Sequence, residues 1–312
     1  MIGQYTLYNW VLYFYIYCFL GWIFESCYVS FHQKKWVNRG FLHGPFLPIY
    51  GSGAVVMLFV SEPFKENLIL TYFAGLVGAT VLELFTGILM ESLFKVRYWD
   101  YSYKKFQWKG YICLSSSLTW GFFTVLMNEV IHPLLLAGMS SVPHALESSC
   151  MVVISCGLAV DLCFSVREAF DLRNILADIE MMQKEVLILR KRADVVIAVL
   201  DQEWKNYLKK HPAAERMDEI GKEMELRFEK LRKLLSVANK LPEHQRVEFL
   251  EIKEHFTKLK EKSIALKEEG RGKAGRLLRG NPTMVSPKYA DAFYSLKKFF
   301  IMKGKRKAGE KK

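Results

Sequence analysis

The sequence lacks the motifs that mark nucleotide-binding, metal-dependent and covalent-catalytic proteins. It contains no Gly-x-x-x-x-Gly-Lys-Ser/Thr loop, so any ATPase would have to be a separate partner. It has neither a Ser nucleophile elbow nor a His-Glu-x-x-His zinc motif. Its six cysteines form no Cys-x-x-Cys pair. The sequence therefore predicts no metal and no cofactor, and it favours a protein that is not an enzyme.

The first residues also lack a basic region, and the apolar run that follows is too long for a signal core. We therefore expect that run to be a retained membrane helix. The whole chain has 312 residues, 51% of them hydrophobic, and a net charge of +12. These averages conceal two halves, because residues 1–166 are apolar and aromatic whereas residues 167–312 are densely charged.

Five apolar runs approach the length of about 20 residues that an α-helix needs to cross a bilayer. They predict an all-α, polytopic membrane domain over residues 1–166. The expected spans lie near residues 7–29, 41–60, 68–94, 110–136 and 145–166. Glycines and prolines interrupt the second run, which is therefore either a full span or a broken, re-entrant element.

Lys and Arg gather in alternate loops, which predicts the orientation of the chain, since cytoplasmic loops carry the excess of basic residues. The basic loops follow the first and third spans and contain Lys34, Lys35 and Arg39, and Lys95, Arg97, Lys104, Lys105 and Lys109. The sequence thus places the amino terminus outside and the long carboxy-terminal tail in the cytoplasm.

Carboxylates within the apolar segments are the sequence's strongest functional signal. A charge at the bilayer centre costs roughly 2.5 to 3.5 kcal/mol on insertion scales, so each needs a partner, a proton or water. These residues are Glu25, Glu83, Glu91, Glu129 and Asp161. In the third span, Gly75, Ala79, Glu83, Gly87 and Glu91 recur every four residues and form a ridge that allows close helix packing. A similar pair, Gly21 and Glu25, lies in the first span, and the two ridges are candidates to pack together.

Most of these acids fall near the expected inner ends of their spans, on the side of the two basic loops. The sequence therefore predicts a polar pocket open to the cytoplasm. Its candidate residues are Glu25, Asn38, Arg39, Tyr50, Glu83, Glu91, Trp99 and Asp100. The alternative is that Glu25 and Glu91 pair with Arg39 and Arg97 only to fix the helices.

Several segments together resemble a bacterial membrane family named as ABC-transporter type IV permeases. They read GWIFES from Gly21, NRGFLHGPFLPIYG from Asn38, LELFTGILMESLF from Leu82 and WDYS from Trp99, and the stretches at 110–114 and 120–121 accompany them. The resemblance covers the first half of the chain. It implies a polytopic inner-membrane protein with the following shared positions: Glu25, Asn38, Arg39, Gly40, Gly44, Pro45, Tyr50, Gly51, Glu83, Glu91, Trp99, Asp100, Tyr101 and Ser102.

The charged half predicts a cytoplasmic, coiled-coil-like helical region over residues 167–270. Apolar residues alternate four and three apart from Ile179 to Leu200, which is a heptad seam. Two further periodic stretches follow, from Ile220 to Ala238 and from Phe249 to Leu266. This pattern fits either an antiparallel hairpin within one chain or a homo-oligomer formed through residues 175–200.

Residues 271–312 begin as a basic, Gly-rich stretch, which predicts a flexible linker, and continue as an amphipathic polybasic tail. The apolar positions are Tyr289, Phe293, Leu296, Phe299 and Phe300, followed by Lys303, Lys305, Arg306 and Lys307. Because the protein is already held at a membrane, these basic residues favour anionic lipids over nucleic acid as the partner.

Taken together, the sequence predicts a multi-pass protein of the bacterial cytoplasmic membrane that acts as a transport-type, permease-like subunit with an unidentified substrate. Two other classes stay open. One is an intramembrane enzyme acting on a lipid or lipid-linked substrate, and the other is a non-catalytic scaffold that recruits partners through its coiled-coil tail.

Overall fold

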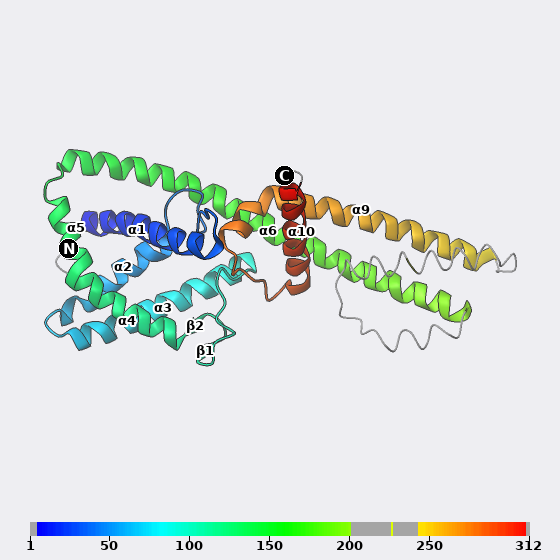
Figure 1. The fold of residues 1–312 in the computed structure, drawn as a ribbon, viewed down its shortest axis with the longest axis horizontal. Helices are drawn as coiled ribbons and strands as arrows, with labels where there is room; N and C mark the ends of the chain where they lie inside the picture. Colours follow the sequence, from blue (N-terminus) through cyan, green and yellow to red (C-terminus); the bar gives the residue numbers. More distant parts are fainter. Residues whose placement is uncertain (1–4, 201–225, 227–242, 310–312) are drawn as a thin grey trace. The chain divides into compact units, whose positions relative to one another are not determined.

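The computed structural model describes residues 5–200, 226 and 243–309, and these residues are mainly helical (Figure 1). The helices are α1 (Leu7–Gln33), α2 (Pro48–Ser61), the 3-10 turn η1 (Glu62–Phe64), α3 (Leu68–Phe94), α4 (Leu114–Leu126), the π-helical turn η2 (Met127–Ile131), α5 (His132–Met139), α6 (His144–Leu200), α9 (Glu243–Gly280) and α10 (Ala290–Gly309). Two short antiparallel strands, β1 (Gln107–Trp108) and β2 (Ile112–Cys113), lie between α3 and α4.

The chain forms two compact units. The first, which we call the membrane unit, comprises residues 1–170 and 275–287. The second, the tail unit, comprises residues 171–274 and 288–312. Both α6 and α9 pass from one unit into the other, so the membrane unit contains a segment that is remote in the sequence.

Within the described residues, four helical stretches are long and apolar enough to cross a membrane. They are Leu7–Gln33, Leu68–Phe94, Leu114–Met139 and His144–Arg192. The expected span at residues 41–60 is not among them, since α2 has only 14 residues and is about 21 Å long at 1.5 Å per residue. Residues 38–47 before it are not helical, because Pro45, Pro48 and Gly40, whose φ is +120°, interrupt regular structure.

Local signals define the helix ends. Thr6 and Asn9 form a capping box at the start of α1, and the side chain of Asn67 accepts a hydrogen bond of 3.0 Å from the N–H of Ile69 at the start of α3. Pro48 begins α2, where its missing N–H costs nothing. Lys34 and Lys95 end α1 and α3 in the left-handed conformation, with φ of 50° and 58°.

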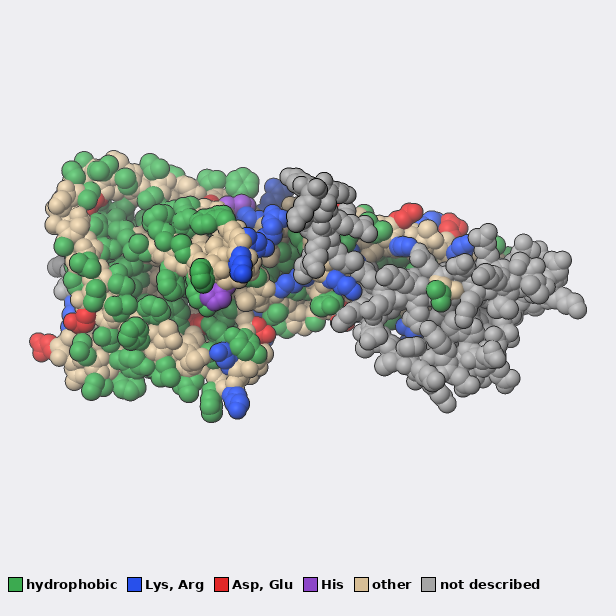
Figure 2. Space-filling model, viewed as in Figure 1, with side chains coloured by type: hydrophobic (Ala, Val, Ile, Leu, Met, Phe, Trp, Pro, Cys, Tyr) green, Lys and Arg blue, Asp and Glu red, His purple; other side chains and the backbone are tan. Residues whose placement is uncertain are grey.

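The two sides of α3 differ in the way that a lipid-facing helix requires. One side is buried and carries small residues and a carboxylate at intervals of four: Thr71, Gly75, Ala79, Glu83 and Gly87. The opposite side exposes Phe73, Val77, Val81 and Phe85. Hydrophobic side chains likewise cover much of the visible face of the membrane unit (Figure 2). α3 therefore presents an apolar side outward and turns its carboxylate Glu83 toward the protein.

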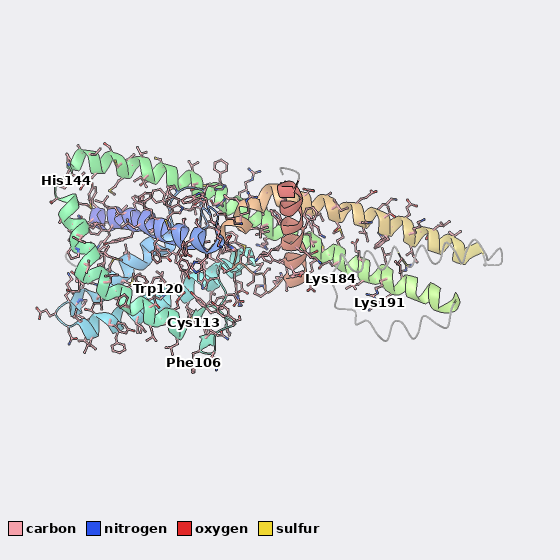
Figure 3. The ribbon with its side chains drawn as sticks, in the orientation of Figure 1. Phe106, Cys113, Trp120, His144, Lys184 and Lys191 are labelled. Carbon is pink, nitrogen blue, oxygen red and sulfur yellow. The ribbon has the colours of Figure 1, made fainter. Side chains whose placement is uncertain are left out.

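The connection between α3 and α4 projects from the helices as a small hairpin. The N–H of Tyr101 donates to the carbonyl of Gly110 at 2.9 Å, and Trp108 pairs with Ile112 in the two strands. Phe106 lies at the end of this connection and points away from the helices (Figure 3). The base of the hairpin is thus held against the helices. The N–H of Leu114, at the start of α4, also donates to the carbonyl of Phe106 at 2.9 Å, whereas the side chains of residues 103–109 are exposed.

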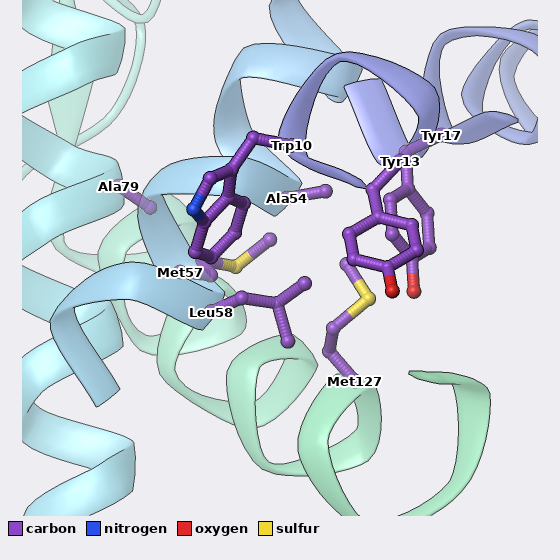
Figure 4. Packing of buried hydrophobic residues seen from close by; sticks show 8 residues of the cluster. All are labelled: Trp10, Tyr13, Tyr17, Ala54, Met57, Leu58, Ala79 and Met127. Carbon is purple, nitrogen blue, oxygen red and sulfur yellow. The ribbon is translucent and has the colours of Figure 1, made fainter. Parts of the chain in front are cut away.

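The core of the membrane unit lies between the first half of α1, α2 and the α4–η2 region. Trp10, Tyr13 and Tyr17 of α1 pack against Met57 and Leu58 of α2 and against Met127 of η2 (Figure 4). This packing fixes α2 beside α1, although α2 is short. The short helix is therefore held by protein contacts along its length.

In the tail unit, the heptad seam is buried within a single copy of the chain. The buried residues of α6 include Leu172, Ile175, Leu176, Ile179, Met182, Val186 and Leu189, and those of α9 include Ile252, Phe256 and Leu259. This burial favours the intrachain hairpin over an oligomer through residues 175–200. The side chains of residues 193–200 and the periodic stretch from Ile220 to Ala238 lie outside the described residues.

The linker expected from residue 271 is helical at its start, since α9 continues without interruption to Gly280. The apolar side of α10 is buried, with Phe293 5% and Leu296 0% exposed, so these side chains pack within the protein rather than on a lipid surface. The side chains of Lys303, Lys305, Arg306 and Lys307 lie outside those that the structure describes.

Candidate functional site

Glu25, in the last third of α1, holds one end of the predicted site. It accepts a hydrogen bond of 3.1 Å from Arg39 Nε and a second from the hydroxyl of Tyr50 in α2. Tyr50 approaches so closely because residue 21 is glycine: a Cβ there would lie 2.3 Å from Tyr50 Cβ. The Gly21 and Glu25 pair thus packs against α2, not against the ridge of α3.

The loop that carries Arg39 is anchored to the same helix. Trp22 Nε1 donates to Asn38 Oδ1 at 2.6 Å, and the N–H of Arg39 donates to Ser26 Oγ at 3.2 Å. Asn38 Nδ2 in turn donates to the carbonyl of His43 at 2.7 Å. The predicted residues Glu25, Asn38, Arg39 and Tyr50 therefore form one connected group.

Glu83 of α3 forms a second group with a different character. Ser116 Oγ lies 3.0 and 2.9 Å from its two carboxylate oxygens, the hydroxyl of Tyr101 donates at 3.0 Å, and Trp120 Nε1 donates at 3.1 Å. The carboxylate is buried, with 5% of the residue exposed. Among the described residues, no Lys or Arg forms an ion pair with Glu83. A buried carboxylate is thus surrounded by neutral donors only.

Tyr101 is held in its neutral, hydrogen-donating form. Burial raises the pKa of its phenol, and the neighbouring Glu83 carboxylate raises it further.

The group around Glu25 adjoins the group around Glu83, because the rings of Tyr50 and Trp120 have centroids 6.3 Å apart.

Glu91, two turns beyond Glu83, belongs to a third group. Arg97 Nε donates to its carboxylate, and Arg97 Nη1 lies 3.8 Å from Asp100 Oδ1. Burial alone would lower the pKa of Arg97, but hydrogen bonding and charge attraction from Glu91 raise it above its usual value. Gly110, with φ of +75°, leaves room for this group, since a Cβ there would lie 2.4 Å from Asp100 Oδ1.

Trp99 contacts Tyr111 and lies beside Gly87 of α3. Its Nε1 donates to the carbonyl of Tyr111 at 2.9 Å, and its ring lies over Gly87, where an added Cβ would meet Trp99 Cζ2 at 3.4 Å. The eight residues predicted from the sequence thus fall into three groups at one end of the membrane unit. The pairs Glu25–Arg39 and Glu91–Arg97 match the alternative reading of those two acids as helix-fixing charges.

A further set of residues completes the site, and sequence reasoning missed it. The segment 275–287 returns to the membrane unit, where Arg39 Nη1 donates to Asn281 Oδ1 at 2.7 Å and to the carbonyl of Gly280 at 3.1 Å. Arg276 lies 2.7 Å from Glu168 Oε2 and donates at 2.8 Å to each of the carbonyls of Phe41 and Leu42. Basic residues in a Gly-rich stretch gave no sign of these distant partners.

The returning segment also joins the loop after α3. The backbones of Arg97 and Val285 exchange two hydrogen bonds, of 2.8 and 3.0 Å, and Ser286 Oγ donates to the carbonyl of Lys95 at 2.6 Å. Thr283 Oγ1 donates to the carbonyl of Tyr98 at 3.2 Å. Residues 275–287 therefore connect both basic loops of the membrane unit.

The remaining membrane carboxylates lie apart from Glu83. Asp161 of α6 accepts backbone hydrogen bonds of 2.9 Å from His43 and 2.7 Å from Gly44, which fixes the loop before α2. Glu129 lines a cavity of about 190 Å³ near the start of α1, together with Tyr5, Leu58, Glu62, Lys65, Asn128, His132, Pro133 and Leu136. None of the eight predicted site residues lines that cavity. In the described part of the chain, His, Cys, Asp and Glu nowhere form a group of three suited to a metal ion.

The helices and their buried polar groups define the class of an integral, helical membrane protein. Comparison with protein families adds that the model of the family described as "Putative ABC-transporter type IV" matches residues 12–166, the apolar part of the chain. The resemblance inferred from the sequence motifs is thereby confirmed. No curated protein and no solved structure matches the chain.

Proposed function

We propose that this chain is a permease-like membrane subunit of a transport complex, and that the carboxylate of Glu83 takes up and releases a proton or a small cation during transport. The family and the apolar helices support the broader class. The role of Glu83 is supported by the hydrogen bonds that Tyr101, Ser116 and Trp120 donate to its carboxylate. Glu25 and Glu91, which pair with arginines, hold the surrounding structure in place.

The donors around Glu83 suit a carboxyl group that changes its state. The hydroxyls of Ser116 and Tyr101 donate to a carboxylate but accept from a protonated carboxyl, whereas an arginine partner would favour only the charge. Such a site takes up and releases a proton or a small cation without leaving an unpaired charge in the membrane. Intramembrane carboxylates of this kind mark proton and ion pathways.

The orientation of the chain is part of the proposal. With the amino terminus outside and the tail inside, the basic loops around Arg39 and Arg97 face the cytoplasm. Residues 38–61 then return the chain across the membrane as an irregular loop followed by α2. Protein contacts support this route, since the N–H of Leu47 donates to the carbonyl of Cys18 at 3.0 Å and Leu42 and Leu47 are buried.

An ATPase supplied by a separate chain would use the cytoplasmic end of this unit. The segment 275–287 supports such an arrangement, because it connects the tail helix α9 to both the Arg39 and the Arg97 loops. Displacement of α9 would therefore act on the groups around Glu25 and Glu91. We propose that this is the route by which the cytoplasmic part is coupled to the membrane site.

The proposal is tested by labelling with a hydrophobic carbodiimide, which modifies protonated carboxyl groups in membranes. We expect mass spectrometry to find the adduct on Glu83, with a rate that falls as pH rises, and little adduct on Glu25 or Glu91. Glu83→Gln should abolish the labelling and leave the melting temperature within a few degrees, because the amide keeps the shape and two of the hydrogen bonds.

Two outcomes would contradict it. If Glu25 or Glu91 were labelled as readily as Glu83, the arginine pairs would not distinguish the three acids. If Glu83→Gln prevented folding whereas the conservative variants Arg39→Lys and Arg97→Lys did not, Glu83 would be a structural residue, and the scaffold reading would gain support.

A further inference from the structure

The tip of the α3–α4 hairpin, residues 103–109, is an exposed surface that the proposed transport role does not use. It reads YKKFQWK and contains three aromatic and three basic residues and no acid. All seven residues are exposed, and Tyr103, Phe106 and Trp108 reach 77%, 73% and 48%. Three large aromatic side chains exposed within seven residues are unusual for a loop in water.

The lysines are arranged beside these rings. Lys104 Nζ lies 5.3 Å from the centroid of the Tyr103 ring, and Lys109 Nζ lies 5.3 Å from that of the Trp108 ring. Both distances fall within the range of a cation–π contact. Aromatic and cationic groups are thus presented side by side, and no carboxylate within the segment neutralises the lysines.

The position of the hairpin in the chain brings it to the membrane surface. It joins α3, which ends at Phe94, to α4, which begins at Leu114, and both helices belong to candidate spans. Its base is fixed by the Tyr101–Gly110 hydrogen bond and by Trp99, so the tip cannot move far from the ends of those helices. Tyr and Trp favour the headgroup level of a bilayer, and lysines there attract anionic headgroups.

We propose that residues 103–109 form a binding surface for anionic phospholipids, with Tyr103, Phe106 and Trp108 seated at the headgroup boundary and Lys104, Lys105 and Lys109 on the lipid phosphates. A soluble protein domain bound to the lysines would leave the three aromatic rings at the lipid boundary without a role. The alternation of charged and aromatic side chains therefore favours a lipid as the partner. The proposal holds whichever side of the membrane the hairpin faces.

The test uses the full-length protein in nanodiscs of phosphatidylcholine with a minor fraction of photoactivatable phosphatidylglycerol. After irradiation, peptide mass spectrometry maps the crosslinks. We expect crosslinks on residues 103–109, and a loss of about tenfold or more in the variant Lys104→Gln/Lys105→Gln/Lys109→Gln, since each basic residue near the surface contributes to binding. A second variant, Tyr103→Ser/Phe106→Ser/Trp108→Ser, should keep headgroup crosslinks and lose those from a probe placed in the acyl chain.

The matched control is Lys191→Gln/Lys253→Gln/Lys262→Gln, which removes the same charge from exposed positions of the tail unit. It should leave the hairpin crosslinks unchanged. Equal crosslinking by a phosphatidylcholine probe, or unchanged phosphatidylglycerol crosslinking in the hairpin lysine variant, would overturn the proposal. If that variant instead lost a stoichiometric protein partner, the surface would be a protein-docking site.

Discussion

Replacing Arg276 with alanine is expected to release residues 275–287 from the membrane unit. The substitution leaves Glu168, whose side chain is 10% exposed, without its guanidinium and leaves the carbonyls of Phe41 and Leu42 without a donor. Removing one partner of a largely buried ion pair costs about 3–5 kcal/mol. Hydrogen exchange of the Val285 amide, which donates to the carbonyl of Arg97, should accelerate by about a hundredfold or more.

Arg271 provides the matched control, one and a half turns earlier in the same helix. Its side chain is 31% exposed and lies 3.6 Å from Glu268, a neighbour in the same helix. Such partly exposed pairs contribute at most about 1 kcal/mol. Arg271→Ala should therefore leave the exchange of Val285 almost unchanged. Equal acceleration by both variants, or none by Arg276→Ala, would show that Arg276 does not hold the segment.

The second large effect is expected at Gly75, where α3 packs closely against Thr124 of α4. A Cβ at residue 75 would lie 1.9 Å from Thr124 Oγ1 and 2.3 Å from Thr124 Cβ. Gly75→Ala must therefore push the two helices apart, and we expect a loss of about 3 kcal/mol in the free energy of unfolding, at the upper end for overpacking. The melting temperature measured in detergent should fall accordingly.

Two companion variants make this prediction specific. At Gly53 of α2 a Cβ would meet nothing within 4 Å, so Gly53→Ala should not lower the melting temperature. Thr124→Gly removes the atoms that clash, so the double variant with Gly75→Ala should be more stable than the sum of the two single effects. If the effects of Gly75→Ala and Thr124→Gly on stability simply added in the double variant, the contact between residues 75 and 124 would be contradicted.

The sequence predicted the helices whose signal is continuous and apolar, and it predicted the small-residue ridge of α3 together with Glu83. The four-residue spacing of Gly75, Ala79, Glu83 and Gly87 allows one arrangement only, which is a single buried stripe. The residue that this stripe would face could not be predicted. The ridge meets Thr124, Tyr111 and other groups that follow it in the chain, whereas Gly21 meets Tyr50.

The prediction failed where a residue's role depends on a distant contact. The basic, Gly-rich stretch from residue 271 predicts a flexible linker, but α9 continues through it to Gly280. Gly270, just before it, provides close packing in α9, because an added Cβ would lie 3.0 Å from Leu296 and 3.2 Å from Ile175. Arg276 and Asn281 bind backbone groups more than 230 positions earlier. No local pattern encodes such contacts, since a glycine or an arginine has the same letter whether it is buried or solvated.

The second expected span illustrates a further limit. Hydropathy counts residues and cannot separate a complete helix from an extended loop that is followed by a short one. The loop at residues 38–47 is held by side chains of α1 and α6, including Trp22, Ser26 and Asp161, whose role as loop partners becomes visible only in three dimensions. The glycines and prolines within residues 41–60 are the sequence signal that predicts an interruption.

The central claim, a transport-type membrane subunit organised around Glu83, is tested most directly by purifying the tagged full-length protein from its native membrane in mild detergent. Quantitative mass spectrometry would identify the proteins that accompany it. We expect a separate ATPase in near-stoichiometric amount, and we expect Glu83→Gln to preserve that complex while lowering its ATP hydrolysis by about tenfold or more. If no ATPase accompanied the intact protein, or if Glu83→Gln left the hydrolysis unchanged, the claim would be contradicted.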